Sequence, residues 1–200
     1  MTGRPSLLIH ACCAPCIGHV YELFADTCAV AFYFFNPNIA PKAEYQTRLS
    51  EIERYARAVG VPLIAGPYDA RTWTLRVRPH RFLGERSRRC RECISVRLEG
   101  AFREAVSRGI EAVTSTLSVS PHKDAAMINA IGGELASRFG IRFIEGDYKE
   151  RDGYRHSVAV SRAYGFYRQS YCGCVWSRLE RTRDPLWQRA VFQSTQTTAP

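Results

Sequence analysis

Short apolar runs alternate with helix-length segments along most of this 200-residue chain, and no other feature constrains its fold more. The apolar runs are rich in branched and aromatic residues and end near turn residues, as strands do. They cover residues 7–9, 28–35, 61–65, 111–117 and 141–145. Parallel strands need long crossover connections, so this alternation predicts a parallel sheet with helices between its strands.

Helical periodicity fills the gaps between those runs. The predicted helices are residues 17–25, a segment from Pro41 to a stop at Gly60, a segment with an inner stripe of Ile94, Leu98, Ala101, Phe102 and Ala105 that ends before Gly109, and a segment that starts at a Ser120–Pro121 cap and reaches Phe139. Helices on both faces make the fold a doubly wound α/β sheet. In such sheets, ligands collect at the carboxyl ends of the strands.

The chain is long enough for one buried core, because 46% of its residues are hydrophobic. We expect one α/β metal-binding catalytic domain over residues 1–185, in which residues 146–180 fold back over the carboxyl edge as a loop and helix. Residues 186–200 are expected to be a partly disordered extension, frayed from Gln193 onward. The longest apolar run is too short for a membrane span, and the start lacks a signal peptide. We therefore expect a cytoplasmic protein with no membrane partner.

Seven of the eight cysteines fall into three close groups: Cys12, Cys13 and Cys16; Cys90 and Cys93; Cys172 and Cys174. A domain of this size folds without disulfides, and thiols in the cytosol stay reduced, so the groups indicate metal binding or redox chemistry. The alternative is a set of buried thiols that act as small hydrophobic residues. Cys28 lies within a predicted strand, and we expect it to pack in the core.

The positions of the thiols favour their ionisation. Cys13 and Cys16 lie at one predicted helix start and Cys90 and Cys93 at another, where free backbone amides stabilise a thiolate, and Arg88, Arg89 and Arg91 add positive charge. Seven thiolates exceed the four that a cubane cluster or a structural zinc requires, so some are free for a second metal or for redox exchange. The strand pattern and the cysteine groups together predict a doubly wound, Rossmann-like (HUP-like) parallel sheet with a cysteine-rich metal site at its carboxyl edge.

Positive charge is concentrated in one stretch of a chain whose formal net charge is +9. Residues 71–91 contain eight arginines and a single acid, Glu85. Such a stretch suits a polyanionic partner with phosphates, although an ordinary solvated basic face has the same composition. Charge alone does not distinguish RNA from DNA.

From about Leu7 to Ser177, the order and spacing of these residues resemble the QueH-type epoxyqueuosine reductases. The matching motifs are His10-Ala-Cys-Cys-Ala-Pro-Cys16; Phe35-Asn-Pro-Asn-Ile39 with Glu44, Tyr45 and Arg48; Arg89-Cys90 with Cys93, Arg97 and Leu98; Thr116-Leu117 with Ser120-Pro-His-Lys123; Asp147 with Lys149; and Tyr167-Arg-Gln-Ser-Tyr-Cys-Gly-Cys174 with Ser177. Two departures are small: Ser115 replaces a common threonine and Asp124 a common asparagine.

The resemblance implies cobalamin-independent reduction of epoxyqueuosine to queuosine in tRNA. The implied cofactors are a [4Fe-4S] cluster and an additional metal ion, with iron expected, and the partners are tRNA containing epoxyqueuosine and an electron donor of unknown identity. We expect Cys12, Cys13, Cys90, Cys93, Cys172 and Cys174 to bind the cofactor, with Cys16 and Asp147 as further metal ligands. The sequence does not divide these ligands between the two metals.

Four residues are candidates for catalysis. Asp147 follows a predicted strand end and could donate a proton or bind metal, but it could also be an ordinary loop carboxylate. His10 could be a ligand or an acid, although a histidine that ends an apolar strand is more often a hydrogen-bonded core group. Tyr45 and Arg48 lie three residues apart on one helix face and could together contact a nucleotide, or pack on the surface.

Six residues are candidates for substrate binding: Asn36, Lys123, Lys149, Arg168, Gln169 and Tyr171. Lys123 follows the predicted Ser120–Pro121 helix start and could complete an anion site, or it could be a solvated lysine. Arg168 and Gln169 could bind phosphate and base edges, with local hydrogen bonding as the alternative.

Two other classes of protein share some of these features. An ATP-dependent tRNA sulphur-inserting enzyme would combine a doubly wound sheet with cysteines and positive charge, but its pyrophosphate loop needs glycines and serine where this chain has Cys-Cys-Ala-Pro-Cys. The other is a non-enzymatic, zinc-stabilised RNA-binding module. Colour separates the latter from an iron-sulphur protein, because zinc sites are colourless.

Overall fold

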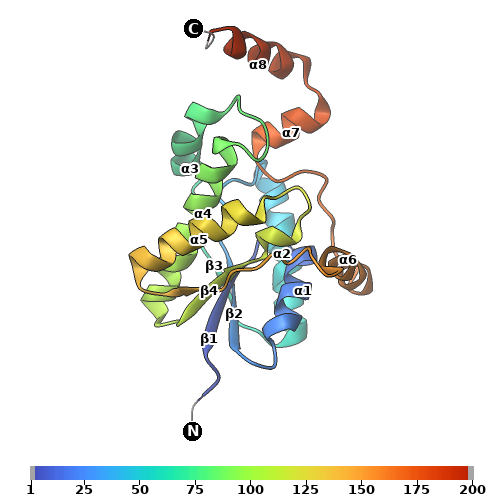
Figure 1. Cartoon of the computed structure of the whole chain (residues 1–200). Helices are drawn as coiled ribbons and strands as arrows, with labels where there is room; N and C mark the ends of the chain where they lie inside the picture. The colour runs from blue at the N-terminus through green and yellow to red at the C-terminus, as the bar shows by residue number, and fades with distance from the viewer. Residues whose placement is uncertain (1–2, 198–200) are drawn as a thin grey trace.

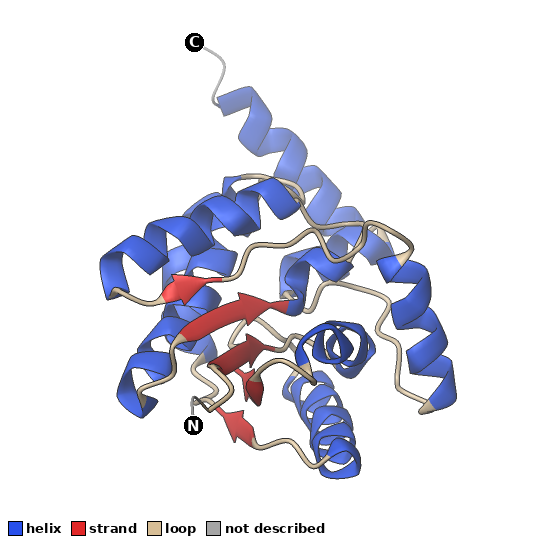
Figure 2. Ribbon diagram, turned by 60° about the horizontal axis from the view of Figure 1, so that its bottom comes forward, coloured by secondary structure: helices blue, strands red, loops and turns tan. Residues whose placement is uncertain are grey.

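The central element is a five-stranded parallel sheet in the order β3-β2-β1-β4-β5, seen in a computed structural model that describes residues 3–197 (Figure 2). The strands are β1 (Ser6–His10), β2 (Ala29–Phe34), β3 (Leu63–Ala65), β4 (Ala112–Ser115) and β5 (Arg142–Phe143). The strand order reverses direction between β1 and β4. In a doubly wound sheet this switch point opens a crevice at the carboxyl edge, so the predicted fold class is confirmed.

Helices cover both faces of the sheet (Figures 1 and 2). On one face lie α1 (Ala14–Phe24), α2 (Lys42–Val59) and α6 (Gly153–Ala163); on the other lie α4 (Arg88–Arg108) and α5 (Ala125–Phe139). The side chains of β1 alternate between the two faces, with Leu7 and Ile9 in one core and Leu8 in the other. All three are almost fully buried, and truncation of such a residue to alanine costs about 2–5 kcal/mol.

A third, smaller cluster lies beyond the carboxyl edge, where α3 (Ala70–Val77) meets α7 (Val175–Thr182). Trp73 and Trp176 pack with their ring centroids 5.2 Å apart, beside Cys93 and Cys174. After α3 comes the short 3-10 helix η1 (Arg78–His80). Cys93 of the second cysteine group and Cys174 of the third therefore pack in one hydrophobic cluster.

Helix ends agree with the sequence at some positions and differ at others. Gly60 and Gly109 cap α2 and α4 in the left-handed conformation, with φ of 70° and 66°. The predicted helix start at Ser120–Pro121 is wrong. Residues Thr116–Val119 form the 3-10 helix η2, and α5 begins at Ala125 because the Asp124 side chain accepts a hydrogen bond from the Met127 amide.

The region after β5 forms two helices, α6 and α7, where one was predicted. Helix α6 packs on α1, and the chain between α6 and α7 returns over the carboxyl edge of the sheet. The last helix, α8 (Pro185–Thr197), lies at the far end of the molecule from the N-terminus (Figure 1). It takes up most of the predicted C-terminal extension, whose last residues, 198–200, lie outside the described residues. Among the helices that the structure describes, none has both the length and the apolar character that a membrane span requires.

Candidate metal centre and substrate cavity

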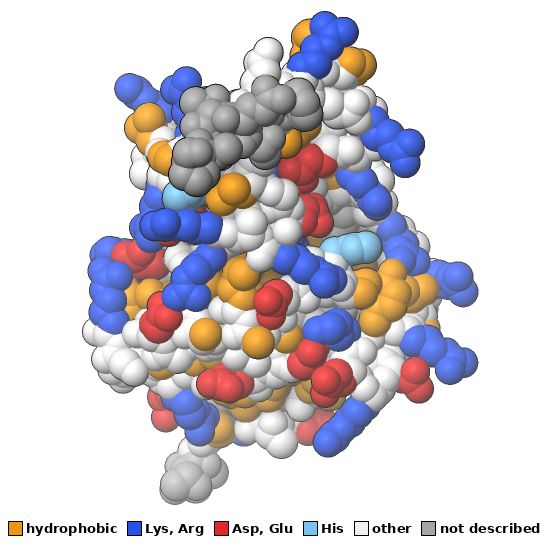
Figure 3. All heavy atoms as spheres, turned by 45° about the horizontal axis from the view of Figure 1, so that its top comes forward, with side chains coloured by type: hydrophobic (Ala, Val, Ile, Leu, Met, Phe, Trp, Pro, Cys, Tyr) orange, Lys and Arg blue, Asp and Glu red, His pale blue; other side chains and the backbone are white. Residues whose placement is uncertain are grey.

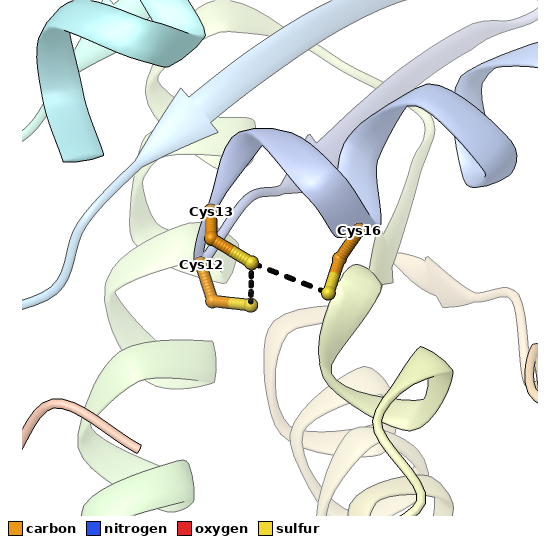
Figure 4. Close-up of side chains that lie close together, drawn as sticks. All are labelled: Cys12, Cys13 and Cys16. Atoms are coloured by element: carbon orange, nitrogen blue, oxygen red, sulfur yellow. Dashed lines mark hydrogen bonds between the residues drawn. The ribbon is translucent and has the colours of Figure 1, made fainter. Parts of the chain in front are cut away.

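The first cysteine group lies in the turn between β1 and α1, at the switch point of the sheet. Cys13 has an extended backbone (φ −169°) and precedes the first turn of α1, which places Cys16 one turn further along. The Cys12 and Cys13 sulphurs lie 3.6 Å apart, and those of Cys13 and Cys16 lie 3.2 Å apart. All three point toward one another within 4.8 Å (Figure 4), the arrangement that a thiolate-bound metal needs.

The three thiols of this group differ in acidity. Hydrogen bonds from Cys13 and Cys16 lower the pKa of Cys12 well below its usual value, and Arg97 and Thr116 add to the effect. The same contacts leave Cys13 and Cys16 as proton donors, which raises the pKa of Cys13 to about 12 and that of Cys16 well above normal. Cys12 is therefore the most acidic thiol of the group.

The second and third cysteine groups line a narrow adjoining cavity. Cys90 and Cys93 lie in the first turns of α4, and Cys172 and Cys174 precede α7. No disulfide joins any cysteine within residues 3–197. Only the first group has three sulphurs within 4.8 Å among the described residues. The seven thiols thus gather in two adjacent sets.

Lys123 and Arg97 connect the two sets, because both line each cavity. The Lys123 ammonium is 2.9 Å from the Cys172 sulphur. Burial alone would raise the pKa of Cys172, but the charge and hydrogen bond of Lys123 bring it below its usual value. Burial opposes the charge of Lys123 as well, and the Cys172 thiolate nevertheless raises its pKa. Each charge of the pair therefore stabilises the other.

A cavity of about 380 Å³ opens beside the cysteines. Cys12, Cys16 and Cys172 form part of its wall. Five further predicted site residues line the cavity: Arg48, Lys123, Arg168, Gln169 and Tyr171. The Gln169 side-chain oxygen is buried and accepts no hydrogen bond from the described residues. Arg48 is fixed by Glu44 and by the backbone oxygens of Tyr171 and Cys172, so it also holds the third cysteine group in place.

Three predicted site residues are buried and line neither cavity. His10 is hydrogen-bonded to Ser115 and to the Phe35 carbonyl, and burial, helped by the charge of Arg97, lowers its pKa to about 3. Its neutral ring thus joins the ends of three strands. Asn36 binds the Ala11 carbonyl and Arg97, and Tyr45 packs on Phe34 and Tyr68. These three side chains therefore belong to the packing of the core and do not face either cavity.

Asp147 and Lys149 form an ion pair with each other and line neither cavity. Both side chains are partly exposed, at 26% and 28%. The structure therefore does not bring Asp147 together with the cysteines, and the contact with Lys149 favours the loop-carboxylate alternative.

The cavity residues that were not among the predicted site residues include two charged side chains, Arg97 and Glu85. Arg97 follows Cys93 by one helical turn and is 2% exposed in the apolar stripe of α4. An arginine beside that stripe was the available signal, because a buried charge needs a partner. Glu85 was the lone acid among eight arginines, and nothing in its spacing indicated that it would face the cavity.

The arginine-rich stretch divides into paired and unpaired side chains. Arg76 pairs with Glu92 and Glu99, Arg89 with Glu180, and Arg91 with Glu134. The other five make no ion pair within the described part of the chain: Arg71, Arg78, Arg81, Arg86 and Arg88. Figure 3 shows the end of the molecule near α8, where lysines and arginines lie around a region that also carries acidic side chains.

Thiols at the switch point of a parallel sheet, next to a cavity rich in cationic side chains, are typical of an α/β enzyme whose cysteines suit a metal. The model of the family "Epoxyqueuosine reductase QueH" matches residues 7–180. The chain is 38% identical over 183 residues to epoxyqueuosine reductase QueH of Thermotoga maritima, covering 88% of this chain and 92% of that protein. The corresponding protein of Haemophilus influenzae is 36% identical, with 88% and 72% covered. This chain belongs to the QueH family, and the predicted resemblance is confirmed.

Proposed function

We propose that this chain reduces epoxyqueuosine in tRNA to queuosine, as the names of its relatives suggest. The observation that carries the proposal is the cavity of about 380 Å³, whose wall joins three cysteines to arginine, lysine and amide side chains. A site of this composition can hold a redox metal beside a nucleotide. Its size also lies within the range of small-molecule sites.

The donor set fits the iron-sulphur centre that the family resemblance implies. Soft thiolates are the preferred ligands of such clusters, and seven free thiols exceed the four that one cluster needs. Four of the seven grouped thiols, from Cys12, Cys13, Cys16, Cys90, Cys93, Cys172 and Cys174, would hold a [4Fe-4S] cluster, and the others would be available for an additional iron. When bound, the cluster would supply electrons one at a time, and the additional iron would act as a Lewis acid.

The proposed reaction removes the epoxide oxygen as water. Two C–O bonds break, a carbon–carbon double bond forms, and two electrons and two protons are consumed. An electron donor of unknown identity supplies the electrons. We call the part of the cavity lined by Cys12, Cys16 and Cys172 its thiol end. Lys123 lies there, next to Cys172, and its ammonium can hold a developing negative charge or pass a proton to it.

Other residues that line the cavity would recognise the nucleotide. The buried Gln169 oxygen can accept an N–H of the 7-deazaguanine base, and that group has no partner among the described residues. Arg168 and Tyr171 line the same cavity. A guanidinium and an aromatic ring suit the phosphate and the base of an unstacked nucleotide. We place the protein with its tRNA substrate in the cytoplasm, where free thiols persist.

The test is anaerobic purification followed by single-turnover reduction of tRNA containing epoxyqueuosine with a chemical reductant. We expect brown protein that contains iron and inorganic sulphide and converts epoxyqueuosine to queuosine in nucleoside analysis. Colourless protein with stoichiometric zinc and no conversion would overturn the proposal in favour of a zinc-stabilised RNA-binding module. Protein that binds the cluster but leaves epoxyqueuosine unchanged would overturn the reaction alone.

A further inference from the structure

Glu85 is an acidic side chain in a cavity whose charged lining is mostly cationic. Five cationic side chains line the same cavity: Arg48, Arg97, Lys123, Arg168 and Arg181. An acid among so many cations normally forms an ion pair with one of them. Glu85 forms none within the described part of the chain, although it lies in the stretch richest in arginine.

The contacts of Glu85 leave one carboxylate oxygen open. Its Oε1 atom accepts a hydrogen bond from the Ser177 hydroxyl at 2.7 Å, and the other oxygen has no hydrogen-bond partner among residues 3–197. The second acid of the cavity, Glu180, differs in this respect. Arg89 donates to both of its oxygens, at 2.6 and 3.0 Å. Glu85 is therefore the carboxylate that a ligand in the cavity can reach.

Ser177 fixes Glu85 at the thiol end of the cavity. The same hydroxyl accepts a hydrogen bond from the Cys172 amide at 3.3 Å, so Ser177 bridges Glu85 and the third cysteine group. The Cys172 sulphur itself is engaged by Lys123. Glu85 thus offers a carboxylate oxygen without a hydrogen bond from the described residues, close enough to Lys123 to raise its pKa and next to the place where the reaction is proposed to occur.

The side chain of epoxyqueuosine carries a matching positive charge. A secondary amine, protonated at neutral pH, joins the methylene group on the 7-deazaguanine base to the ring that bears the epoxide. When that ring lies at the thiol end, the ammonium is only a few bonds away and faces a wall of cations. A carboxylate must offset this repulsion, because a desolvated charge needs an opposite partner.

We propose that Glu85 binds this ammonium group and thereby sets the specificity of the cavity for aminomethyl-linked 7-deazaguanine bases. The inference rests on the proposed function for the identity of the substrate. Ser177 acts as a positioning residue, since it holds the carboxylate through its hydroxyl.

The test compares two anticodon stem-loop RNAs that differ in one group on the modified base. One carries 7-aminomethyl-7-deazaguanine, which is a cation, and the other 7-cyano-7-deazaguanine, which is neutral. Binding to anaerobically purified protein is measured by fluorescence anisotropy. We expect the wild type to prefer the aminomethyl RNA by about 10-fold, the size of one charge-assisted hydrogen bond. Glu85→Gln should abolish this preference, and Glu85→Asp should keep part of it.

Glu104→Gln is the matched control. It makes the same change of charge on α4, 14 residues after Cys90 and therefore about 20 Å further along the helix axis. Glu104 pairs with Arg108 on an exposed face, so its variant should keep the full preference. Equal binding of the two RNAs by the wild type, or a preference that survives in Glu85→Gln, would overturn the inference.

A kinetic experiment separates this inference from the proposed function. With tRNA containing epoxyqueuosine, Glu85→Gln should raise KM about 10-fold while iron and sulphide content stay at the wild-type level. A wild type that discriminates between the two stem-loops but reduces nothing would refute the reaction and keep the ammonium site. A wild type that reduces epoxyqueuosine without discriminating would refute only the ammonium site.

Discussion

The thiols around the cavity are not equivalent before metal binds. The pKa of Cys12 and of Cys172 is lowered by hydrogen-bonded neighbours, whereas that of Cys13 and of Cys174 is raised, for Cys174 by burial. Because only the thiolate attacks, we expect iodoacetamide to alkylate Cys12 and Cys172 first in metal-free protein at pH 7. Peptide mass spectrometry over time gives the order. Cys13 reacting as fast as Cys12 would contradict this ranking.

Lys123 contributes most to the lowered pKa of Cys172, and Arg97 adds to it. Lys123→Met keeps the length of the side chain but removes the ammonium that lies 2.9 Å from the sulphur. Alkylation of Cys172 should then slow about 10-fold or more, the effect of at least one pKa unit when the thiol is only partly ionised. Alkylation of Cys12 in the same variant serves as the internal control, since its acidity comes from Cys13 and Cys16.

The sequence left two roles open for Asp147, a proton donor or metal ligand and an ordinary loop carboxylate, and its contact with Lys149 favours the second. Loss of a positioned acid lowers turnover by about 100- to 10,000-fold. The Asp147 carboxylate pairs with Lys149 and lines neither cavity, so we expect Asp147→Asn to reduce single turnover less than about 10-fold and to keep the wild-type ratio of iron to sulphide. A loss of 100-fold or more with the chromophore intact would restore Asp147 as the proton donor.

Cys28 tests the grouping of the cysteines. It lies just before β2, at the amino edge of the sheet, and packs on the first core, whereas the other seven lie toward the carboxyl edge. Cys28→Ala should therefore retain both iron and activity. The readouts are metal analysis and the single-turnover assay, and loss of iron from folded protein would show that the grouping is wrong.

At the residue scale, the sequence predicted which segments meet but not which way each side chain points. Lys123, Arg168, Gln169 and Tyr171 line the cavity as substrate-binding residues would. Tyr45 and Arg48 show the limit of the prediction, because they share a helix face and yet only Arg48 reaches the cavity. Tyr45 is held in the core by Phe34 and Tyr68, from strands and loops distant in sequence. A periodicity argument on one helix contains no information about those partners.

At the element scale, strands and long helices followed from periodicity, and the short elements did not. The start of α5 was predicted four residues too early, since Ser-Pro is a common helix start and the 3-10 helix η2 has no distinct pattern. This difference changes the interpretation of Lys123. Its ammonium is not part of a helix amino-terminal anion site but the partner of Cys172.

The arginines in and just after α3 and η1 are close in sequence but differ in their partners. Arg78 and Arg81 make no ion pair among the described residues, and Arg78 is exposed. Neutralising both as Arg78→Gln and Arg81→Gln should weaken tRNA binding and reduce the slope of log affinity against log salt by about 1–2, because fewer counterions are released. Binding titrations at four salt concentrations provide the slope.

Arg76→Gln is the control for that experiment, because Arg76 lies on α3 only two residues before Arg78. Arg76 already pairs with Glu92 and Glu99, so its removal should change the slope little. If the double variant keeps the wild-type slope, the stretch is an ordinary solvated face. If Arg76→Gln lowers the slope as much as the double variant, the ion pairs open when tRNA binds and the distinction fails.

At the scale of the whole molecule, the fold brings together three thiol groups from residues 12–16, 90–93 and 172–174. Two groups belong to the sheet and its covering helices, and the third to the chain that returns after α6. That chain is held mainly by polar contacts, such as those of Arg48 with the carbonyls of Tyr171 and Cys172. A metal bound by all three groups would cross-link the returning chain to the rigid sheet.

Metal removal should therefore loosen one part of the molecule before the rest. We expect chelator-treated, reduced protein to exchange amide hydrogens faster in residues 165–174 while β1 and β4 keep their protection, because both strands lie inside the sheet. The melting temperature should fall as well, by about 2–4 °C for each kcal/mol of binding energy lost in a chain of this size. Hydrogen exchange with mass spectrometry compares loaded and chelated protein directly. Cys28→Ala is the control variant, since it should show the same difference. Equal exchange in residues 165–174 with and without metal would mean that the third cysteine group does not share the metal site.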